Sequence, residues 1–155
     1  MNGPEQGEQP FYAKGLQFEC LSCGGCCTGF PGYVYLSKHD IARASEFLRM
    51  HDGEFIERHT RIVTVFHERR LSLTERKNFD CIFWNEGCTI YPARPCQCRT
   101  FPFWKRRLIS RREWEKTTSI CRGVNRGRVY SREEIERCVR DVPAYNIDRF
   151  AQPIR

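Results

Sequence analysis

The sequence has few aliphatic side chains and no long apolar run. Its mean hydropathy is −0.62, and charged residues make up 29% of its 155 residues. No apolar stretch approaches the ~18 residues that suggest a membrane span. The first ten residues are polar and lack the apolar region of a signal peptide. We therefore expect a cytoplasmic protein with no membrane association and a small, irregular core.

Internal repeats and low-complexity blocks are also absent from the sequence. A chain of this length is typical of one domain, with or without tails. We predict a disordered N-terminal tail over residues 1–15, because this stretch is polar and contains glycine and proline. The folded domain is expected over residues 16–145, followed by a C-terminal tail over residues 146–155.

One long stretch contains no acidic residue. Between Arg94 and Arg112 there are seven basic side chains, and the remaining 19 basic residues balance 19 acidic ones. The stretch could be a patch for nucleic acid or for an acidic partner. It could instead compensate metal-bound thiolates, since a four-thiolate zinc or 4Fe–4S site carries a charge of about −2. We favour charge compensation. Nucleic acid is therefore only an alternative partner, and the identity of a protein partner is unknown.

Cysteine, in contrast, is abundant. Four of the ten cysteines lie in the run Cys20-Leu-Ser-Cys23-Gly-Gly-Cys26-Cys27. Such close spacing lets one turn of backbone direct several sulfurs to a common point, and Gly24 and Gly25 can adopt positive φ at little steric cost. Thiolate sulfur suits zinc and iron–sulfur clusters. In a cytoplasmic chain this pattern favours metal ligands over the alternative, a disulfide framework.

A second cysteine-rich segment runs from Cys81 to Pro102. Its four cysteines and three prolines exclude a long regular element, and we predict that it wraps against the first run. The candidate metal ligands are Cys20, Cys23, Cys26, Cys27, Cys81, Cys88, Cys98 and Cys121. In an extended backbone the adjacent side chains of Cys26 and Cys27 would point to opposite sides. Eight thiols therefore allow two metal sites or one multinuclear cluster.

The other two cysteines and two arginines have more open roles. Cys138 lies in a predicted helix, where a buried, inert thiol is expected. Cys96 could be a ligand or a bystander. Arg94 and Arg99 flank the second segment, and we predict them as cofactor-binding residues that donate N–H groups to thiolates or to a bound anion. The alternative for both arginines is an ion pair with Glu86 or Asp80.

The spacing of the first run also bears on the metal. Cys20-x2-Cys23-x2-Cys26 has the first three spacings of a bacterial ferredoxin, but position 30 is Phe and no second copy exists. A two-cluster ferredoxin is therefore not expected. Three close cysteines with a remote fourth favour a 4Fe–4S cluster slightly over zinc. A cluster would give a redox or accessory protein, whereas zinc would give a structural or interaction module.

The periodicity of the remaining chain predicts an α+β fold, a small, irregular, metal-stabilised domain with a few short strands and about three helices. Two capping boxes, Ser37 with Asp40 and Ser131 with Glu134, predict helix starts. Residues 112–118 fit a strand or a short helix. Strands are expected at 33–36, 62–67 and 71–74, and helices at 37–50, 53–60 and 131–142.

Two separated motifs together resemble a known family. They are Cys20-x2-Cys23-x2-Cys26-Cys27 and Cys81-x6-Cys88-x-Ile90-Tyr91-x2-Arg94-Pro95-x2-Cys98-Arg99-x-Phe101-Pro102. In this order they are similar to the CxxCxxCC family of zinc- or iron-chelating proteins, also described as YkgJ-type Fe–S-cluster-containing proteins. The resemblance implies a bacterial or archaeal cytoplasmic protein with cysteine-bound metal. Cys96 and Cys138 lie outside the family pattern.

The resemblance does not imply one activity. Some larger members of the family are linked to methylation of flagellin lysines, which makes a lysine-methyltransferase-like enzyme or subunit one alternative function. The sequence shows no glycine-rich loop for S-adenosylmethionine after a strand, so whether the protein is an enzyme is left open. A further alternative is a zinc module that binds nucleic acid or protein through the basic stretch.

Overall fold

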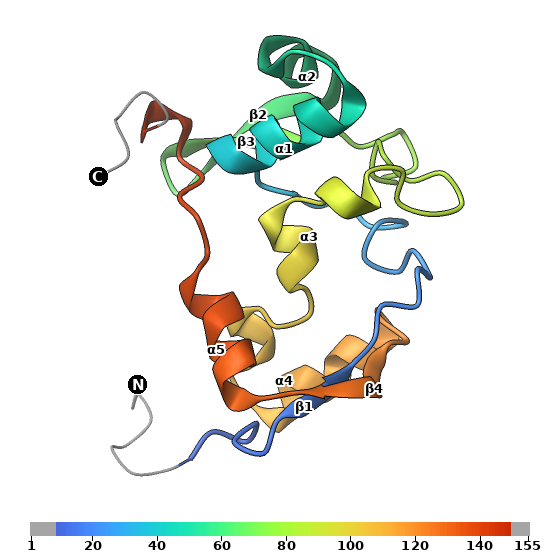
Figure 1. Cartoon of the computed structure of the whole chain (residues 1–155), viewed down its shortest axis with the longest axis vertical. Helices are drawn as coiled ribbons and strands as arrows, with labels where there is room; N and C mark the ends of the chain where they lie inside the picture. The colour runs from blue at the N-terminus through green and yellow to red at the C-terminus, as the bar shows by residue number, and fades with distance from the viewer. Residues whose placement is uncertain (1–8, 150–155) are drawn as a thin grey trace. The chain divides into compact units, whose positions relative to one another are not determined.

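The computed structural model describes residues 9–149 and confirms the α+β class (Figure 1). These residues form five α-helices and four β-strands, and the strands make two separate two-stranded sheets. The chain divides into two compact units. Of the described residues, unit 1 contains 9–21 and 102–141, and unit 2 contains 22–101 and 142–149. None of the described helices is both long enough and apolar enough to cross a membrane.

Unit 1 is built on an antiparallel pair of strands that are far apart in sequence. Strand β1 (Leu16–Phe18) pairs with β4 (Val124–Tyr130), and the register shifts between Gln17 and Phe18. The pair was not predicted because most side chains of β4 are exposed, so its sequence lacks the alternation that identifies a half-buried strand. The core of this unit is aromatic: Phe103 stacks on the buried Trp114, with ring centroids 5.6 Å apart.

The helices of unit 1 begin at hydroxyl caps. Helix α4 (Arg111–Lys116) has Ser110 as its N-cap and settles the open assignment of residues 112–118 as helical. Helix α5 (Arg132–Arg140) starts at the capping box of Ser131 and Glu134, as predicted. Two short 3-10 turns complete this unit, η2 (Lys105–Arg107) and η3 (Thr117–Ser119).

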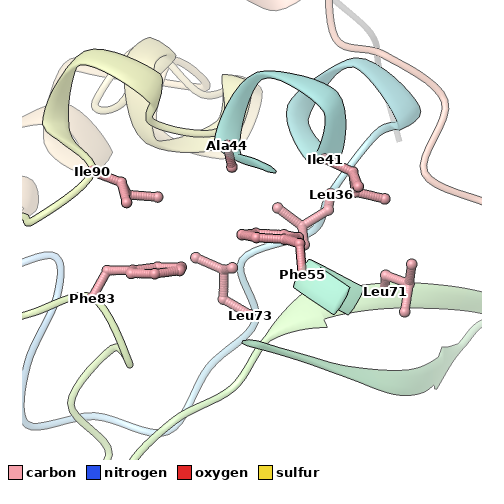
Figure 2. Close-up of a cluster of buried hydrophobic side chains, with 8 residues drawn as sticks. All are labelled: Leu36, Ile41, Ala44, Phe55, Leu71, Leu73, Phe83 and Ile90. Atoms are coloured by element: carbon pink, nitrogen blue, oxygen red, sulfur yellow. The ribbon is translucent and has the colours of Figure 1, made fainter. Parts of the chain in front are cut away.

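Unit 2 contains the larger hydrophobic core, which Figure 2 shows. Helix α1 (Lys38–Leu48) starts at the predicted capping box of Ser37 and Asp40, and α2 (Asp52–His59) follows it closely. Strands β2 (Thr60–Val65) and β3 (Glu68–Leu73) form a hairpin, and η1 (Tyr91–Ala93) precedes α3 (Cys96–Thr100). The buried core residues are Leu36, Ile41, Ala44, Phe55, Leu71, Leu73, Phe83 and Ile90.

Two details of unit 2 differ from the prediction. The expected strand at 33–36 is only an isolated bridge between Tyr35 and Ser72, although Leu36 N donates to Leu71 O at 3.0 Å. Strand β2 ends at Val65, because Phe66 and His67 both have positive φ and form the hairpin turn. The predicted strand 62–67 is therefore shifted toward the N-terminus.

Parts of both predicted tails have defined backbone structure. Residues 10–15 form turns in which Ala13 N donates to Pro10 O and Gly15 N donates to Tyr12 O. At the other end, Ile147 packs against the core of unit 2, in the 3-10 turn η4 (Ile147–Arg149). Apolar and aromatic side chains at these ends provide the contacts that polar tails would lack. The remainder of the predicted tails, residues 1–8 and 150–155, lies outside the described residues.

We expect Phe55→Ala to lower the free energy of unfolding by about 3–5 kcal/mol, because it leaves a cavity in a packed core. Phe55 has 0% of its surface exposed, whereas Phe47 of the neighbouring helix has 44% exposed. Phe47→Ala is thus the matched control and should cost less than about 1 kcal/mol. Urea denaturation followed by circular dichroism measures both. Equal losses would contradict the assigned core.

Candidate metal centre

The two cysteine-rich segments meet inside unit 2. Cys81 N donates a hydrogen bond to Cys27 O at 2.7 Å, and Gly29 N donates to the carboxylate Oδ1 of Asp80 at 3.2 Å. These bonds hold the first run against the start of the second segment. As a result, five thiols lie within electrostatic reach of one another. They are Cys26, Cys27, Cys81, Cys88 and Cys98.

A glycine shapes the loop of the first run. Gly24 has φ = +76°, and its carbonyl accepts hydrogen bonds from Cys27 N at 2.9 Å and from Thr28 Oγ1 at 2.8 Å. A Cβ at Gly24 would lie 2.5 Å from the indole of Trp84, so a side chain here would push the two segments apart. Glycine is therefore required for both conformation and close packing.

This turn corrects the expectation for the adjacent cysteines. Because the backbone is turned rather than extended, the Sγ atoms of Cys26 and Cys27 lie side by side, 3.6 Å apart. The geometric reason for placing them on two different metal sites is thus removed. The count of metal sites itself stays a prediction.

A buried carboxylate positions the helix that carries Cys98. Asp40 is 2% exposed, and its Oδ2 accepts from Ser37 N and Oγ at the start of α1. Its Oδ1 accepts from Cys96 N, the first residue of α3, at 2.8 Å. Gln97 adds a clamp, since it donates to Tyr33 O and accepts from Tyr35 N. The sequence identified Asp40 as a capping residue but gave no signal for this second contact.

The pKa values show how crowded the thiols are. Burial, together with the nearby thiolates, raises the pKa of Cys98, and burial also raises the pKa of Cys81. The hydrogen bond between the adjacent sulfurs lowers the pKa of Cys26 to about 7 and raises that of Cys27. Either sulfur can donate in this pair, and the pKa shifts favour Cys27 as the donor.

These observations test whether the residues fit a thiolate-bound metal. Thiols that raise the pKa of one another give up their protons readily only when a cation replaces them. The guanidinium of Arg94 lowers the pKa of both Cys26 and Cys98, but one such charge does not balance five sulfurs. The donor set suits zinc or an iron–sulfur cluster and suits calcium or magnesium poorly. Within residues 9–149, however, no three Cys, His, Asp or Glu side chains are already arranged to hold a metal ion.

The two predicted cofactor-binding arginines differ in their contacts. The guanidinium of Arg94 lies 3.7 Å from the centroid of the Tyr91 ring, and its Nε donates to Tyr91 O at 3.0 Å. Arg99 Nε donates to Arg94 O at 3.1 Å and so supports the backbone of Arg94. Neither forms the alternative ion pair with Glu86 or Asp80 in the part of the chain that the structure describes.

The remaining candidate ligands are divided between the two units. Cys23 is half-buried in the loop of unit 2, whereas Cys20 and Cys121 belong to unit 1, where Cys20 is exposed and Cys121 is buried. Their ligand roles stay predictions. All ten cysteines are free, so the alternative of a disulfide framework is not observed.

Cys96 is separated from Cys98 by the helical backbone. Both lie in α3, and residues two apart on a helix do not face each other, which corrects the expectation for an extended segment. Cys96 instead lies near Tyr145, whose pKa is raised by burial and by this thiol. Tyr145 in turn packs against Tyr35, with ring centroids 5.6 Å apart. The sequence gave no signal for Tyr145, because it lies in a region of unclear pattern.

An α+β domain with a thiol-rich centre is thus the class that fold and site define, and comparison with known proteins supplies the family. Residues 19–122 match the CxxCxxCC model, described as a "putative zinc- or iron-chelating domain". The chain belongs to this family of cysteine-rich metal-binding proteins. No solved structure matches it.

Two relatives are informative. Over 88 residues the chain is 34% identical to YkgJ, an uncharacterized protein of Escherichia coli O157:H7, covering 53% of this chain and 72% of YkgJ. Over 155 residues it is 23% identical to the uncharacterized protein MJ0939 of Methanocaldococcus jannaschii, covering 91% of this chain and 49% of that protein. The chain thus spans about half the length of the archaeal relative.

We expect Gly24→Ala to lower metal content sharply, because the new Cβ collides with Trp84 and separates the two segments. Gly29→Ala is the matched control: Gly29 also has positive φ, +82°, but a Cβ there meets nothing within 4 Å. Both variants carry the same backbone strain, so metal analysis of the purified proteins isolates the contact with Trp84. Equal loss of metal in both variants would refute its importance.

In metal-free protein, iodoacetamide should modify Cys26 before Cys98. The pKa of Cys26 is lowered to about 7, so its reactive thiolate becomes populated as the pH rises through neutrality. The pKa of Cys98 is raised, so its thiol stays protonated over the same range. Mass spectrometry of digested protein after labelling at a series of pH values measures both rates. Faster labelling of Cys98 would contradict the assignment.

Proposed function

We propose that this protein holds a 4Fe–4S cluster and serves as a redox or accessory protein in a reducing, cytoplasmic compartment. The ligands in this proposal are Cys26, Cys81, Cys88 and Cys98. The observation that carries it is the meeting of the two cysteine segments through the hydrogen bond from Cys81 N to Cys27 O. In agreement, burial and then the nearby thiols of Cys81, Cys26 and Cys88 raise the pKa of Cys98.

The number of thiols in this proposal suits a 4Fe–4S cluster, which takes four thiolate ligands. In a 4Fe–4S cluster each thiolate binds a different iron, so the sulfurs lie farther apart than around one metal ion. Cys81, Cys26 and Cys88 all lie close enough to Cys98 to raise its pKa, which supports these four thiols as one ligand set. When bound, such a cluster supplies one-electron transfer.

The protein's own groups around the sulfurs would then set the reduction potential. Cys27 can donate its S–H to the sulfur of Cys26, at 3.6 Å, and the positive charge of Arg94 lies near Cys26 and Cys98. Hydrogen bonds and positive charge near cluster sulfurs stabilise the more negative, reduced state. Trp84 lies close against the backbone of Gly24, where the two segments meet.

One distance favours zinc as the second candidate. Around a tetrahedral zinc ion with Zn–S bonds of about 2.3 Å, neighbouring sulfurs are about 3.8 Å apart. The 3.6 Å between the sulfurs of Cys26 and Cys27 is close to this value. A zinc site would use Cys27 as a ligand rather than as a hydrogen-bond donor, and it would make the protein a structural or interaction module.

Anaerobic purification followed by iron, sulfide and zinc analysis tests the proposal. We expect a brown protein with stoichiometric iron and sulfide, and loss of both in Cys98→Ser, because a predicted ligand is removed. Cys138→Ser is the matched control and should keep its iron, since Cys138 lies on α5 of unit 1. Cys27→Ser separates the candidates: it retains the cluster if Cys27 is a donor, whereas it loses the metal if Cys27 is a zinc ligand.

A colourless protein with one zinc ion per chain would replace the iron–sulfur proposal by the zinc alternative. Iron retained in Cys98→Ser, or lost equally in Cys138→Ser, would contradict the assigned ligands.

A further inference from the structure

The excess positive charge of the protein belongs to unit 1. Its described residues include thirteen basic and seven acidic side chains, whereas those of unit 2 include twelve basic and ten acidic. The five thiols of the candidate metal centre belong to unit 2. The basic stretch seen in the sequence is thus divided: Arg94 and Arg99 lie in the unit that carries the thiols, and the other five cations do not.

These five cations form what we call the basic patch: Lys105, Arg106, Arg107, Arg111 and Arg112. The first three form η2, and the last two are the first residues of α4, whose N-cap is Ser110. None of them forms an ion pair in the part of the chain that the structure describes, although other arginines of unit 1 do, such as Arg128 with Glu134. The nearest acidic side chain in sequence, Glu113, pairs with Lys116.

One member of the patch shows an unmet need for an anion. The Nε atom of Arg107 is buried and has no hydrogen-bond partner. Its burial and the neighbouring charge of Arg106 lower the pKa of Arg107, so the arrangement is unfavourable in the isolated protein. Glu113 partly offsets these effects. The side chain of Arg107 is only partly buried, so an acidic partner could add a second carboxylate at its accessible end.

An exposed apolar residue separates the two basic runs of the patch in sequence. Ile109 is 74% exposed and stands between the two runs of basic residues, while its neighbour Leu108 is buried. An exposed apolar centre with a charged rim is the usual composition of a protein–protein interface. Opposite charge on the partner then steers the encounter and fixes its register.

The large exposed apolar residues of the same unit give no specific support for nucleic acid. Sequence-tolerant binding of single strands relies on aromatic side chains on which the bases stack. In unit 1 the large exposed apolar residues are Leu21, Ile109 and Val129, none of them aromatic, while Trp114 and Phe103 are buried in the core. This argument applies to the described residues of the unit, 9–21 and 102–141.

We propose that the basic patch, together with Ile109, docks an acidic protein surface that presents an apolar site. The acidic carboxylates would engage Arg106, Arg107 and Arg112, and the apolar site would cover Ile109. This surface belongs to unit 1, whereas the five converging thiols belong to unit 2.

Fluorescence anisotropy with the full, metal-loaded chain tests the proposal. Three labelled probes of equal formal charge are compared: a peptide of alternating Glu and Leu, a peptide of Glu alone, and an oligothymidylate. We expect the Glu–Leu peptide to bind most tightly and to weaken as salt rises. Replacing Arg106, Arg107 and Arg112 by Ser together should weaken it about tenfold, since each exposed charge contact contributes up to about 1 kcal/mol.

Two further variants make the test specific. Ile109→Ser should weaken binding of the Glu–Leu peptide and leave binding of the Glu peptide unchanged, because only the Glu–Leu peptide has an apolar contact to lose. A control that removes the same charge from unit 2 (Arg49, Arg58 and Lys77 to Ser) should have little effect, because these side chains lie outside the patch.

Tighter binding of the oligothymidylate than of either peptide would overturn the proposal in favour of nucleic acid. Equal weakening of peptide binding by the patch and control variants would show that only net charge matters. That result would also overturn the proposal. Iron and zinc content of each variant is measured in parallel. A variant that loses peptide binding but keeps its metal content has lost the function of the patch and not the metal centre.

Discussion

The hydrogen bond from Cys81 N to Cys27 O is the constraint on which the candidate metal centre depends. It joins two segments separated by more than fifty residues of chain and lies within one residue of Cys26. The close approach of Trp84 to Gly24 reinforces the join. Without these contacts the thiols of unit 2 would belong to two independent loops. The free energy of metal binding would then have to offset the conformational entropy lost when both loops become ordered, as in many small metal-binding domains.

The features predicted well from sequence were those with a local cause. Both capping boxes use a side chain three residues away, so the starts of α1 and α5 could be read directly. The meeting of the two cysteine segments was predicted from composition, because clustered thiols in a reducing compartment have few other uses. The α+β class followed from the same local patterns.

The features that were missed depend on contacts distant in sequence. Strand β4 is mostly exposed, so no alternation marks it, and its pairing with β1 becomes visible only in three dimensions. The side-by-side sulfurs of Cys26 and Cys27 depend on a turn that Gly24 closes. Likewise, Asp40 carries a hydrogen bond to Cys96 N that its role as a capping residue does not reveal.

The interleaved order of the two units has a consequence for synthesis of the protein. Strand β1 emerges from the ribosome early, yet its partner β4 follows about a hundred residues later. The segment 22–101, which contains the hairpin and all five converging thiols, is complete well before that. Unit 2 can therefore begin to fold, and its cysteines can be loaded, while β1 still waits unpaired on the nascent chain. Delivery of metal during translation, rather than after release, would then be compatible with the order in which the chain appears.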